Sequence, residues 1–528
     1  MFESDGETML PVDNDIRENI LNAHGNVVIS ASAGTGKTYT TIQRIIKDTK
    51  DCADYKTFAA ITFTRKASKE IMNRLGPNKA NGFIGTNDNF ILVEVIQAFM
   101  HDAFGVDFKI EIKPDFNDDN RVKNFEAGVE KIRETHLMCK YTNIRKNFAF
   151  QLALEILQRS HAARRYLKSK YYRIYIDEYQ DSDVDMHAFF MFLADELLIP
   201  LFIVGDSKQS IYGWRGAYSN GFTSLFKKSS FSKYELWHNF RSNKVIQNYS
   251  NIFMESVREH YQLTEFNEEI IACKYNEDNE AVAYIKEWID PNKKCAFLNF
   301  SNGNAEYWSE KLQIASVPFV YIPGSPLDHS SIESEHIWIA RGIASYTLQQ
   351  RYSEYNFMDE IPMPEAFSLS EIRKILKSIV EVQKNSELYE QNCLKLYDYL
   401  NFNEDLEKIK REVGKLVEVV NDEKYIPTYN QSRYKLTAGT IHSSKGLEFE
   451  QVIINAADYN LSREGIIFLH YVAISRPEDR LLIIGRNRIM DSYLYEVEKV
   501  IQKTRELGYK IEIENVMKVV DSRKLLKV

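Results

Sequence analysis

Short apolar runs that end in polar residues recur along the first part of the chain. Three of them are NVVIS (26–30), TFAAITFT (57–64) and LFIVGD (201–206), and segments with helical spacing, such as KASKEIMNRL (66–75), lie between them. Buried strands separated by helices are typical of a doubly wound parallel sheet. The pattern therefore predicts an α/β fold.

A second set of strands of the same character follows. It comprises CAFLNF (295–300), VPFVYIP (317–323), EQVIINAAD (450–458) and RLLIIG (480–485). Within each set, one long stretch has helical spacing and no convincing strand, which indicates an insertion. We therefore expect two parallel-sheet domains, each interrupted by a helical insertion: the first sheet domain over 1–90 and 164–233, its insertion over 91–163, the second sheet domain over 234–329 and 433–528, and its insertion over 330–432.

The segment ASAGTGKT (Ala31–Thr38) lies between the first strand and a helical segment. A loop of small residues in this position presents backbone N–H groups to phosphates, and the following helix directs its positive end toward them. Lys37 would reach the β- and γ-phosphates of a nucleotide, and Thr38 would bind Mg²⁺. The loop residues predicted to contact the nucleotide are Ala33, Gly34, Thr35, Gly36, Lys37 and Thr38.

The run YYRIYIDEYQDSD (171–183) predicts a buried strand that ends at two adjacent carboxylates, Asp177 and Glu178. Hydrolysis of a nucleoside triphosphate needs an anchored Mg²⁺ and an oriented water. An acidic pair after a strand is usually a solvated turn, but the phosphate loop in the same chain favours catalysis. We expect Asp177 to bind Mg²⁺ beside Thr38 and Glu178 to activate the water.

Three further side chains are candidates for contact with the γ-phosphate. Gln209 follows the strand 201–206 and is expected at the same sheet edge as the phosphate loop. Arg241 is expected at the end of a strand that opens the second domain, and Arg476 in a similar setting. By spacing alone each arginine is more often a surface residue. If both arginines reach from one domain to a triphosphate bound by the other, they would act as arginine fingers.

Two other groups of residues have open interpretations. Glu448, expected among apolar neighbours in GTIHSSKGLEFEQVII (439–454), could hold a ribose hydroxyl or cap a helix. Tyr212, Trp214 and Arg215 follow Gln209 and offer stacking platforms for single-strand bases. The alternative for the two aromatic residues is a hydrophobic anchor for their own loop.

Composition and charge narrow the choice of partners. The net charge is −8, so nucleic acid would have to bind through local basic and aromatic surfaces. The five cysteines form no CxxC pair, which argues against a zinc or iron–sulfur site and fits a reducing compartment. No signal pattern or membrane-spanning apolar run is present, so we expect a cytoplasmic protein.

Seven strings resemble, in order, the motifs of the UvrD/Rep class of superfamily 1A helicases. They are ASAGTGKT, ITFTRKASKEI, IDEYQDSD, VGDSKQSIYGWRGA, NFRS, IHSSKGLEF and VAISRPEDRL, and they cover most of the chain. The resemblance implies two RecA-like motor domains, 1A and 2A, with helical insertions 1B and a reduced 2B. It also implies ATP hydrolysis with Mg²⁺ and 3′-to-5′ movement on single-stranded DNA.

The resemblance further implies roles for individual residues. Lys37, Gln209, Arg241 and Arg476 would contact the phosphates, and Glu448 would hold the ribose. The glutamine and the tyrosine that contact adenine in this class correspond to Asn19 and Phe240, which leaves the preference for ATP over other nucleotides open. The implied DNA contacts are Phe63, Thr64, Thr86, Tyr212, Trp214, Arg215 and His442.

Within the class, the chain is most similar to the B-subunit family of the Gabija anti-phage system. The chain is short, its second insertion is small, and FIGTNDNF (83–90) stands where most relatives carry a Thr-Phe-His-Ser-Phe-like string. The resemblance implies a hetero-oligomer with an A subunit that combines an ABC-type ATPase with a TOPRIM nuclease. The B subunit would sense DNA ends or single strands and activate that nuclease.

Two other functions share part of this chemistry. A housekeeping repair helicase would unwind DNA processively without a partner. A nucleotide-gated module that regulates a nuclease would turn over no faster than its Glu178→Gln variant. The small second insertion disfavours the first, and the intact Glu178 and both arginines disfavour the second.

Overall fold

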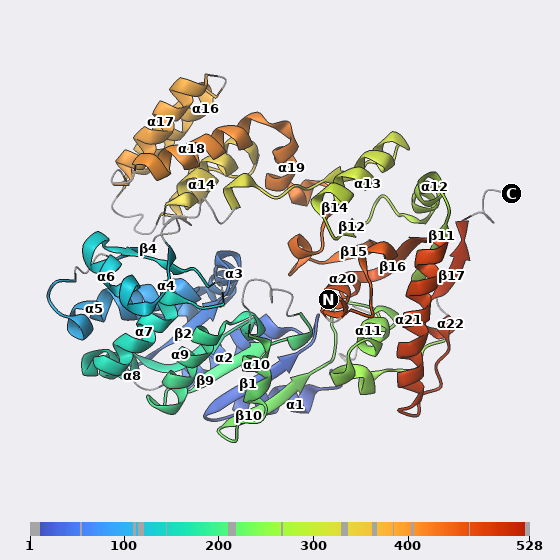
Figure 1. The fold of residues 1–528 in the computed structure, drawn as a ribbon, viewed down its shortest axis with the longest axis horizontal. Coiled ribbons are helices and arrows are strands. Elements are labelled where there is room, and N and C mark those ends of the chain that lie inside the picture. The colour runs from blue at the N-terminus through green and yellow to red at the C-terminus, as the bar shows by residue number, and fades with distance from the viewer. Residues whose placement is uncertain are drawn as a thin grey trace.

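The structure, a computed structural model, describes residues 11–52, 55–108, 112–114, 121–143, 145–209, 218–265, 268–328, 336–361, 367–383, 385–402, 406–463 and 465–522. Two parallel sheets organise these residues, which confirms the predicted α/β fold class (Figure 1). No helix in these ranges is long and apolar enough to cross a bilayer.

The first sheet has six parallel strands in the order β10-β1-β9-β8-β2-β3. Its strands are β1 (Asn26–Ala31), β2 (Thr57–Thr62), β3 (Phe83–Thr86), β8 (Tyr171–Ile176), β9 (Leu201–Gly205) and β10 (Phe231–Leu236). The helices that connect them are α1 (Asn14–Asn22), α2 (Lys37–Asp51), α3 (Arg65–Leu75), α9 (Val184–Asp195) and α10 (Ser219–Leu225).

Both faces of this sheet are buried. On β2, Ala59 and Ile61 enter one apolar core, whereas Phe58 and Ala60 enter another on the opposite face. Successive side chains of a strand point to opposite faces, so two cores require helices on both sides of the sheet. The polar residues that follow the strands therefore gather at one edge, where the parallel strands all end.

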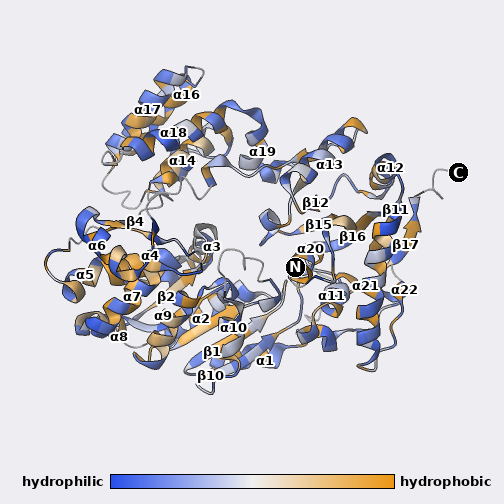
Figure 2. Ribbon diagram, in the orientation of Figure 1, coloured by the Kyte–Doolittle hydropathy of each residue, from blue (hydrophilic) through white to orange (hydrophobic). Residues whose placement is uncertain are grey.

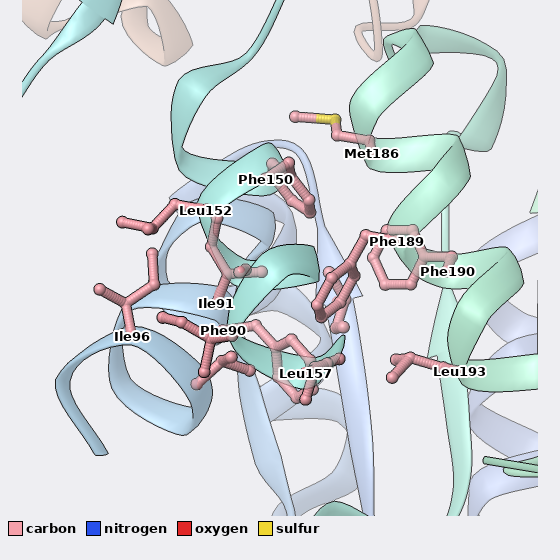
Figure 3. Close-up of a cluster of buried hydrophobic side chains, with 14 of the residues drawn as sticks. Phe90, Ile91, Ile96, Phe150, Leu152, Leu157, Met186, Phe189, Phe190 and Leu193 are labelled. Atoms are coloured by element: carbon pink, nitrogen blue, oxygen red, sulfur yellow. The ribbon is translucent and has the colours of Figure 1, made fainter. Parts of the chain in front are cut away.

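The first insertion shares the larger of these cores. Its elements are α4 (Asn87–Ile91), η2 (Leu92–Ile96), α5 (Gln97–Phe104), α6 (Phe125–Thr135), α7 (Phe148–Arg159), α8 (His161–Lys170) and the short strands β4 (Lys113–Pro114), β5 (Arg121–Val122), β6 (Leu137–Met138) and β7 (Lys140–Tyr141). The Phe189 ring of α9 lies 6.5 Å from the Phe90 ring and 5.6 Å from the Phe150 ring (Figure 3). This aromatic packing fixes the insertion to the sheet.

The second sheet has seven parallel strands in the order β13-β14-β12-β15-β16-β11-β17. They are β11 (Ile270–Tyr275), β12 (Cys295–Asn299), β13 (Val320–Tyr321), β14 (Leu436–Thr440), β15 (Phe449–Asn455), β16 (Pro477–Arg486) and β17 (Lys518–Asp521). Its helices are α11 (Lys244–Ile252), α12 (Asp278–Trp288), α13 (Asn302–Ile314), α20 (Ile466–Ile474), α21 (Asn487–Arg505) and α22 (Ile513–Val516).

The second insertion has helices and no strand among its described residues, and it has an apolar core of its own. It comprises α14 (Ile337–Leu348), α15 (Glu354–Met358), α16 (Leu369–Glu381), α17 (Ser386–Tyr399), α18 (Leu406–Asn421) and α19 (Ile426–Tyr429). It lies at the top of Figure 1, apart from both sheets. Its helices mix apolar and polar residues, whereas the central strands β1 and β9 of the first sheet are strongly apolar (Figure 2).

The structure differs from the expected elements in two places. The boundary expected at 233/234 falls inside β10, which pairs with β1, so the first sheet extends to Leu236. The strand expected over 317–323 pairs only at Val320 and Tyr321. Val317 and Phe319 are buried in the core although they are outside β13, which explains why their apolar pattern resembled that of a longer strand.

Candidate functional site

The phosphate loop connects β1 to α2, as the sequence predicts. Gly34 and Gly36 have φ values of +73° and +79°, which only glycine adopts without strain. The Thr35 hydroxyl donates to the Ser32 carbonyl at 2.9 Å, and Lys37 Nζ donates to the Ala31 carbonyl at 3.2 Å. Because α2 begins at Lys37, the N–H groups of its first turn have no helical acceptor and form an anion site.

The two predicted carboxylates follow β8. Asp177 is buried and donates its N–H to the Ile61 carbonyl at 3.1 Å. Burial, and then the charge of Glu178, raise the pKa of Asp177 well above its usual range, although Lys37 and a hydrogen bond from Thr38 act against them. Thr38 and Asp177 therefore lie together, as expected. Lys37 offsets only part of the cost of burying this carboxylate, and a divalent cation would add further positive charge.

Glu178 is held in an unusual backbone conformation. Its φ is +53°, in the left-handed region that non-glycine residues rarely occupy. Gln180 Nε2 donates to Glu178 Oε2 at 2.5 Å, and Gln180 Oε1 accepts the N–H of Asp206 at 2.8 Å. Strain of this kind persists where surrounding contacts impose it, often at active sites. The Gln180 amide thus orients Glu178 against the end of β9.

The charges around Glu178 keep it ionised. Burial acts to raise its pKa, but the positive charges of Lys37 and Lys445, together with the Gln180 hydrogen bond, lower it below its usual range. An ionised carboxylate can accept a proton from water. This geometry fits the role predicted for Glu178.

A third carboxylate, Asp206, was not singled out from the sequence. It follows β9, is fully buried, and its oxygens accept from Gln209 Nε2 at 2.7 Å and contact Lys208 Nζ at 2.9 Å. Burial acts to raise the pKa of Asp206, but Lys208 and Lys37 lower it. Its position directly after an apolar strand was a signal equivalent to that of Asp177. Asp206 fixes the Gln209 side chain at the sheet edge.

The segment Trp237–Asn243 links the two sheets. The Phe240 N–H donates to the Gly34 carbonyl at 2.9 Å, and Asn243 bonds to β16 through the Glu478 carbonyl at 2.9 Å. Arg241 therefore lies on this link between the sheets, not at the end of a strand that opens the second domain. It pairs with Glu448, which is 45% exposed and not enclosed by apolar neighbours as expected.

Arg476 reaches the first domain from the second. It follows α20, not a strand, and is 1% exposed, so it is not a surface arginine. Its Nη2 donates to Gln209 Oε1 at 3.3 Å, and its Nε donates to the Val472 carbonyl at 2.9 Å. Burial and the positive charge of Arg241 lower the pKa of Arg476 to about 10. Two neighbouring guanidinium groups fit an anionic group bound between them.

Lys445 is a second residue that the sequence analysis did not single out. It lies in IHSSKGLEF, one of the strings that resemble helicase motifs, but the pattern of that string indicated no role for its side chain. Its Nζ donates to Asp181 Oδ2 at 2.6 Å and to the Gln209 carbonyl at 3.3 Å, and lies 4.0 Å from Glu178 Oε2. It therefore bonds the second domain to the catalytic edge of the first.

Asn19 does not join this site. It is exposed on α1, two residues from Arg17. Because two residues turn a helix by about 200°, Asn19 lies on the opposite side of α1 from Arg17. Arg17 instead lies over the Phe240 ring, 4.8 Å from its centre, and pairs with Asp13 at 2.7 Å. Phe240 is 58% exposed beside the phosphate loop, as a base platform requires. Arg17, and not Asn19, is therefore the α1 residue that contacts Phe240.

The candidate DNA contacts lie at the carboxyl ends of strands in both sheets. Thr64 lies two residues beyond β2 and caps α3, and Thr86 ends β3 and caps α4; their hydroxyls accept from backbone N–H groups at 3.2 and 3.3 Å. Phe63 packs partly against the first core, and His442 follows β14. Tyr212, Trp214 and Arg215 lie outside the described residues.

Comparison with known proteins agrees with this arrangement. The model of the UvrD/REP helicase N-terminal domain matches residues 12–147 and 135–230. Gabija protein GajB of Bacillus cereus is 35% identical over 95% of this chain and 99% of its own. ATP-dependent DNA helicase PcrA of Staphylococcus epidermidis is 23% identical over 89% of this chain and 80% of its own. DNA helicase II of Escherichia coli is 26% identical over 57% of this chain and 50% of its own.

A solved structure of a DEAD box protein from Methanococcus jannaschii covers 96% of this chain and 91% of its own at a TM-score of 0.34, which is too low to bear on function. The similarity to GajB extends over nearly the full length of both chains, and the motifs of the site lie within it. On this evidence, the chain belongs to the GajB family of UvrD/REP-type helicases.

Proposed function

We propose that this chain is a DNA-dependent NTP hydrolase that moves 3′ to 5′ on single-stranded DNA. In an anti-phage complex, it would couple hydrolysis to the activation of a partner nuclease. The observation that carries the proposal is the contact of Arg476, from the second domain, with Gln209 beside the phosphate loop of the first. Hydrolysis at such a site depends on how the two domains are apposed.

Each residue of the site would have a distinct role in hydrolysis. The phosphate loop and Lys37 would hold the triphosphate of ATP, with Phe240 under the base and Glu448 near the ribose. Thr38 and Asp177 would hold Mg²⁺, which neutralises charge on the phosphates when bound. Glu178 would accept a proton from the attacking water, and Gln209, Arg241 and Arg476 would stabilise the charge that develops on the γ-phosphate.

The DNA strand would cross the carboxyl edges of both sheets. In the first sheet domain Phe63 and Thr64 follow β2 and Thr86 ends β3, and in the second His442 follows β14. Movement of one sheet domain against the other would then shift the strand by steps. Tyr212, Trp214 and Arg215, which lie outside the described residues, are our further candidates for stacking on bases.

The partner assignment rests on the family. GajB is named as a Gabija protein, and we infer that this chain forms a hetero-oligomer with a Gabija A-type subunit, an ABC-ATPase with a TOPRIM nuclease domain, in the cytoplasm. The small second insertion, with its separate core, is one surface available to such a subunit.

The proposal is tested by measuring ATP hydrolysis with and without single-stranded DNA. We expect stimulation by DNA, and Lys37→Ala or Glu178→Gln should lower the stimulated rate by about a hundredfold or more. Lys415→Met, on an exposed helix face of α18, is the control and should match wild type. Hydrolysis that no DNA stimulates, or that survives Glu178→Gln, would contradict the proposal.

A further inference from the structure

Lys445 lies where the two domains meet at the catalytic carboxylates. Its side chain is 13% exposed, and that of its partner Asp181 is 6% exposed. Charge-assisted hydrogen bonds that exclude water are stronger than those at the surface. The other oxygen of Asp181, Oδ1, has no hydrogen-bond partner among the described residues. Burial raises the pKa of Asp181 to about 6, and the charge and the hydrogen bond of Lys445 act against this rise.

Asp181 is coupled to Glu178 through a single turn. The short helix η4 (Tyr179–Asp181) begins directly after Glu178, and the Asp181 N–H donates to the Glu178 carbonyl at 3.0 Å. This turn carries the left-handed backbone of Glu178. A contact that holds Asp181 thus also holds the backbone from which the Glu178 carboxylate extends.

The loop that carries Lys445 makes two other contacts with residues of the candidate site. It runs from Ile441 to Glu448, between β14 and β15, and begins beside the candidate DNA contact His442. The Leu447 carbonyl accepts from Arg476 Nη1 at 3.3 Å, and Glu448 pairs with Arg241. One loop of the second domain therefore reaches the DNA edge, both arginines and the carboxylate turn of the first domain.

We propose that Lys445 is a positioning residue for hydrolysis. By bonding Asp181 across the domain interface, it holds the Glu178 turn in register with the second domain, so that Glu178 faces the attacking water when the domains are apposed. The inference rests on the proposed function and deepens it, because it names the residue through which DNA contact at the 441–448 loop would control the rate.

Lys445→Met tests the proposal in the full-length chain. With saturating single-stranded DNA, we expect kcat for ATP to fall about ten- to hundredfold, because one buried charge-assisted bond is lost. The KM for ATP and the affinity for DNA should stay within about threefold of wild type, since the Lys445 ammonium bonds to Asp181 and to the Gln209 carbonyl. Lys445→Arg retains the charge and should recover most of the rate. Lys415→Met, which breaks an exposed lysine–glutamate pair, is the matched control.

Asp181→Asn gives an independent test. If Lys445 acts through Asp181, this variant should lose a similar factor in kcat, and the double variant should be no slower than the slower single one. Losses that multiply would contradict the proposal. Should Lys445→Met fail to fold, as urea unfolding would show, Asp181→Asn and Lys445→Arg decide the question.

The outcomes separate this inference from the function on which it rests. A wild-type chain whose hydrolysis DNA does not stimulate would overturn both. A stimulated wild type with Lys445→Met within about twofold of its kcat would overturn the positioning role alone. A fall in the unfolding midpoint with a matching rise in KM and unchanged kcat would also overturn it, because that pattern indicates a purely structural contact.

Discussion

Gly34 is the residue at which the phosphate loop and the linking segment come closest. A Cβ atom there would lie 2.2 Å from Asn239 Oδ1 and 3.0 Å from Arg241 Cβ, and the residue has a φ of +73°. An alanine would have to push away the segment that positions both Phe240 and Arg241. This close approach is a second reason, besides the positive φ, why position 34 of the loop needs a glycine.

Gly34→Ala should therefore damage the site more than the fold. We expect the rate of ATP hydrolysis to fall by about tenfold or more, because Arg241 would be displaced. Gly25→Ala is the control, since Gly25 has a similar φ of +68° with nothing within 4 Å. Each substitution should cost about 1 kcal/mol of stability for the left-handed backbone, measured by urea unfolding. Equal rates in the two variants would argue against the contact.

At the scale of the element, α20 carries both Arg476, just beyond its end, and the buried His470. The His470 Nε2 lies 2.6 Å from the Tyr493 hydroxyl, which in turn bonds to Tyr249. Burial lowers the pKa of His470 to about 3. The helix that delivers the arginine is thus anchored by an imidazole that stays neutral in the folded protein.

This anchor predicts acid sensitivity of the second domain. Between pH 3 and pH 6.5 the unfolded chain binds a proton at His470 that the folded chain does not, so stability falls as the pH is lowered through this window. From pH 6.5 to pH 5 the loss should be about 2 kcal/mol. Urea unfolding over this range should show a shallower pH dependence for His470→Gln than for wild type. An equal pH dependence of stability in wild type and His470→Gln would contradict the assignment of this proton to His470.

At the scale of the whole molecule, two sheet domains with separate cores contribute side chains to one site. Arg476 and Lys445 belong to the second domain, whereas Gln209 and the carboxylates belong to the first. A nucleotide bound between them would contact both domains. Its binding energy would then favour the apposed arrangement over separated ones.

Arg476→Lys tests this dependence on both domains. Lysine keeps the charge but cannot make the divergent contacts of the guanidinium group, so we expect hydrolysis to fall by about a hundredfold or more. The thermal stabilisation by a non-hydrolysable ATP analogue should also shrink, since fewer contacts to the second domain remain. Arg486→Ala, which removes an exposed pair with Asp278, is the control. Undiminished stabilisation in Arg476→Lys would contradict a nucleotide site shared by the domains.

The amino-acid sequence by itself determined the sheet class and the local parts of the site. Apolar runs defined β1, β2, β8 and β9 closely, because buried strands are identified by composition over a few residues. Loops between a strand and a helix, such as that of Lys37, carry their chemistry in adjacent positions. Asp177 and Glu178 were found for the same reason.

Only the tertiary structure decided which distant residues meet. Arg17, and not Asn19, is the α1 residue that contacts Phe240, because the orientation of a helix depends on its packing. Pairing with β1 placed β10 in the first sheet. Asp206 and Lys445 gained their roles from contacts made across the fold, Lys445 with a partner 264 residues away. Such contacts follow from how two cores dock, which no local pattern in the chain encodes.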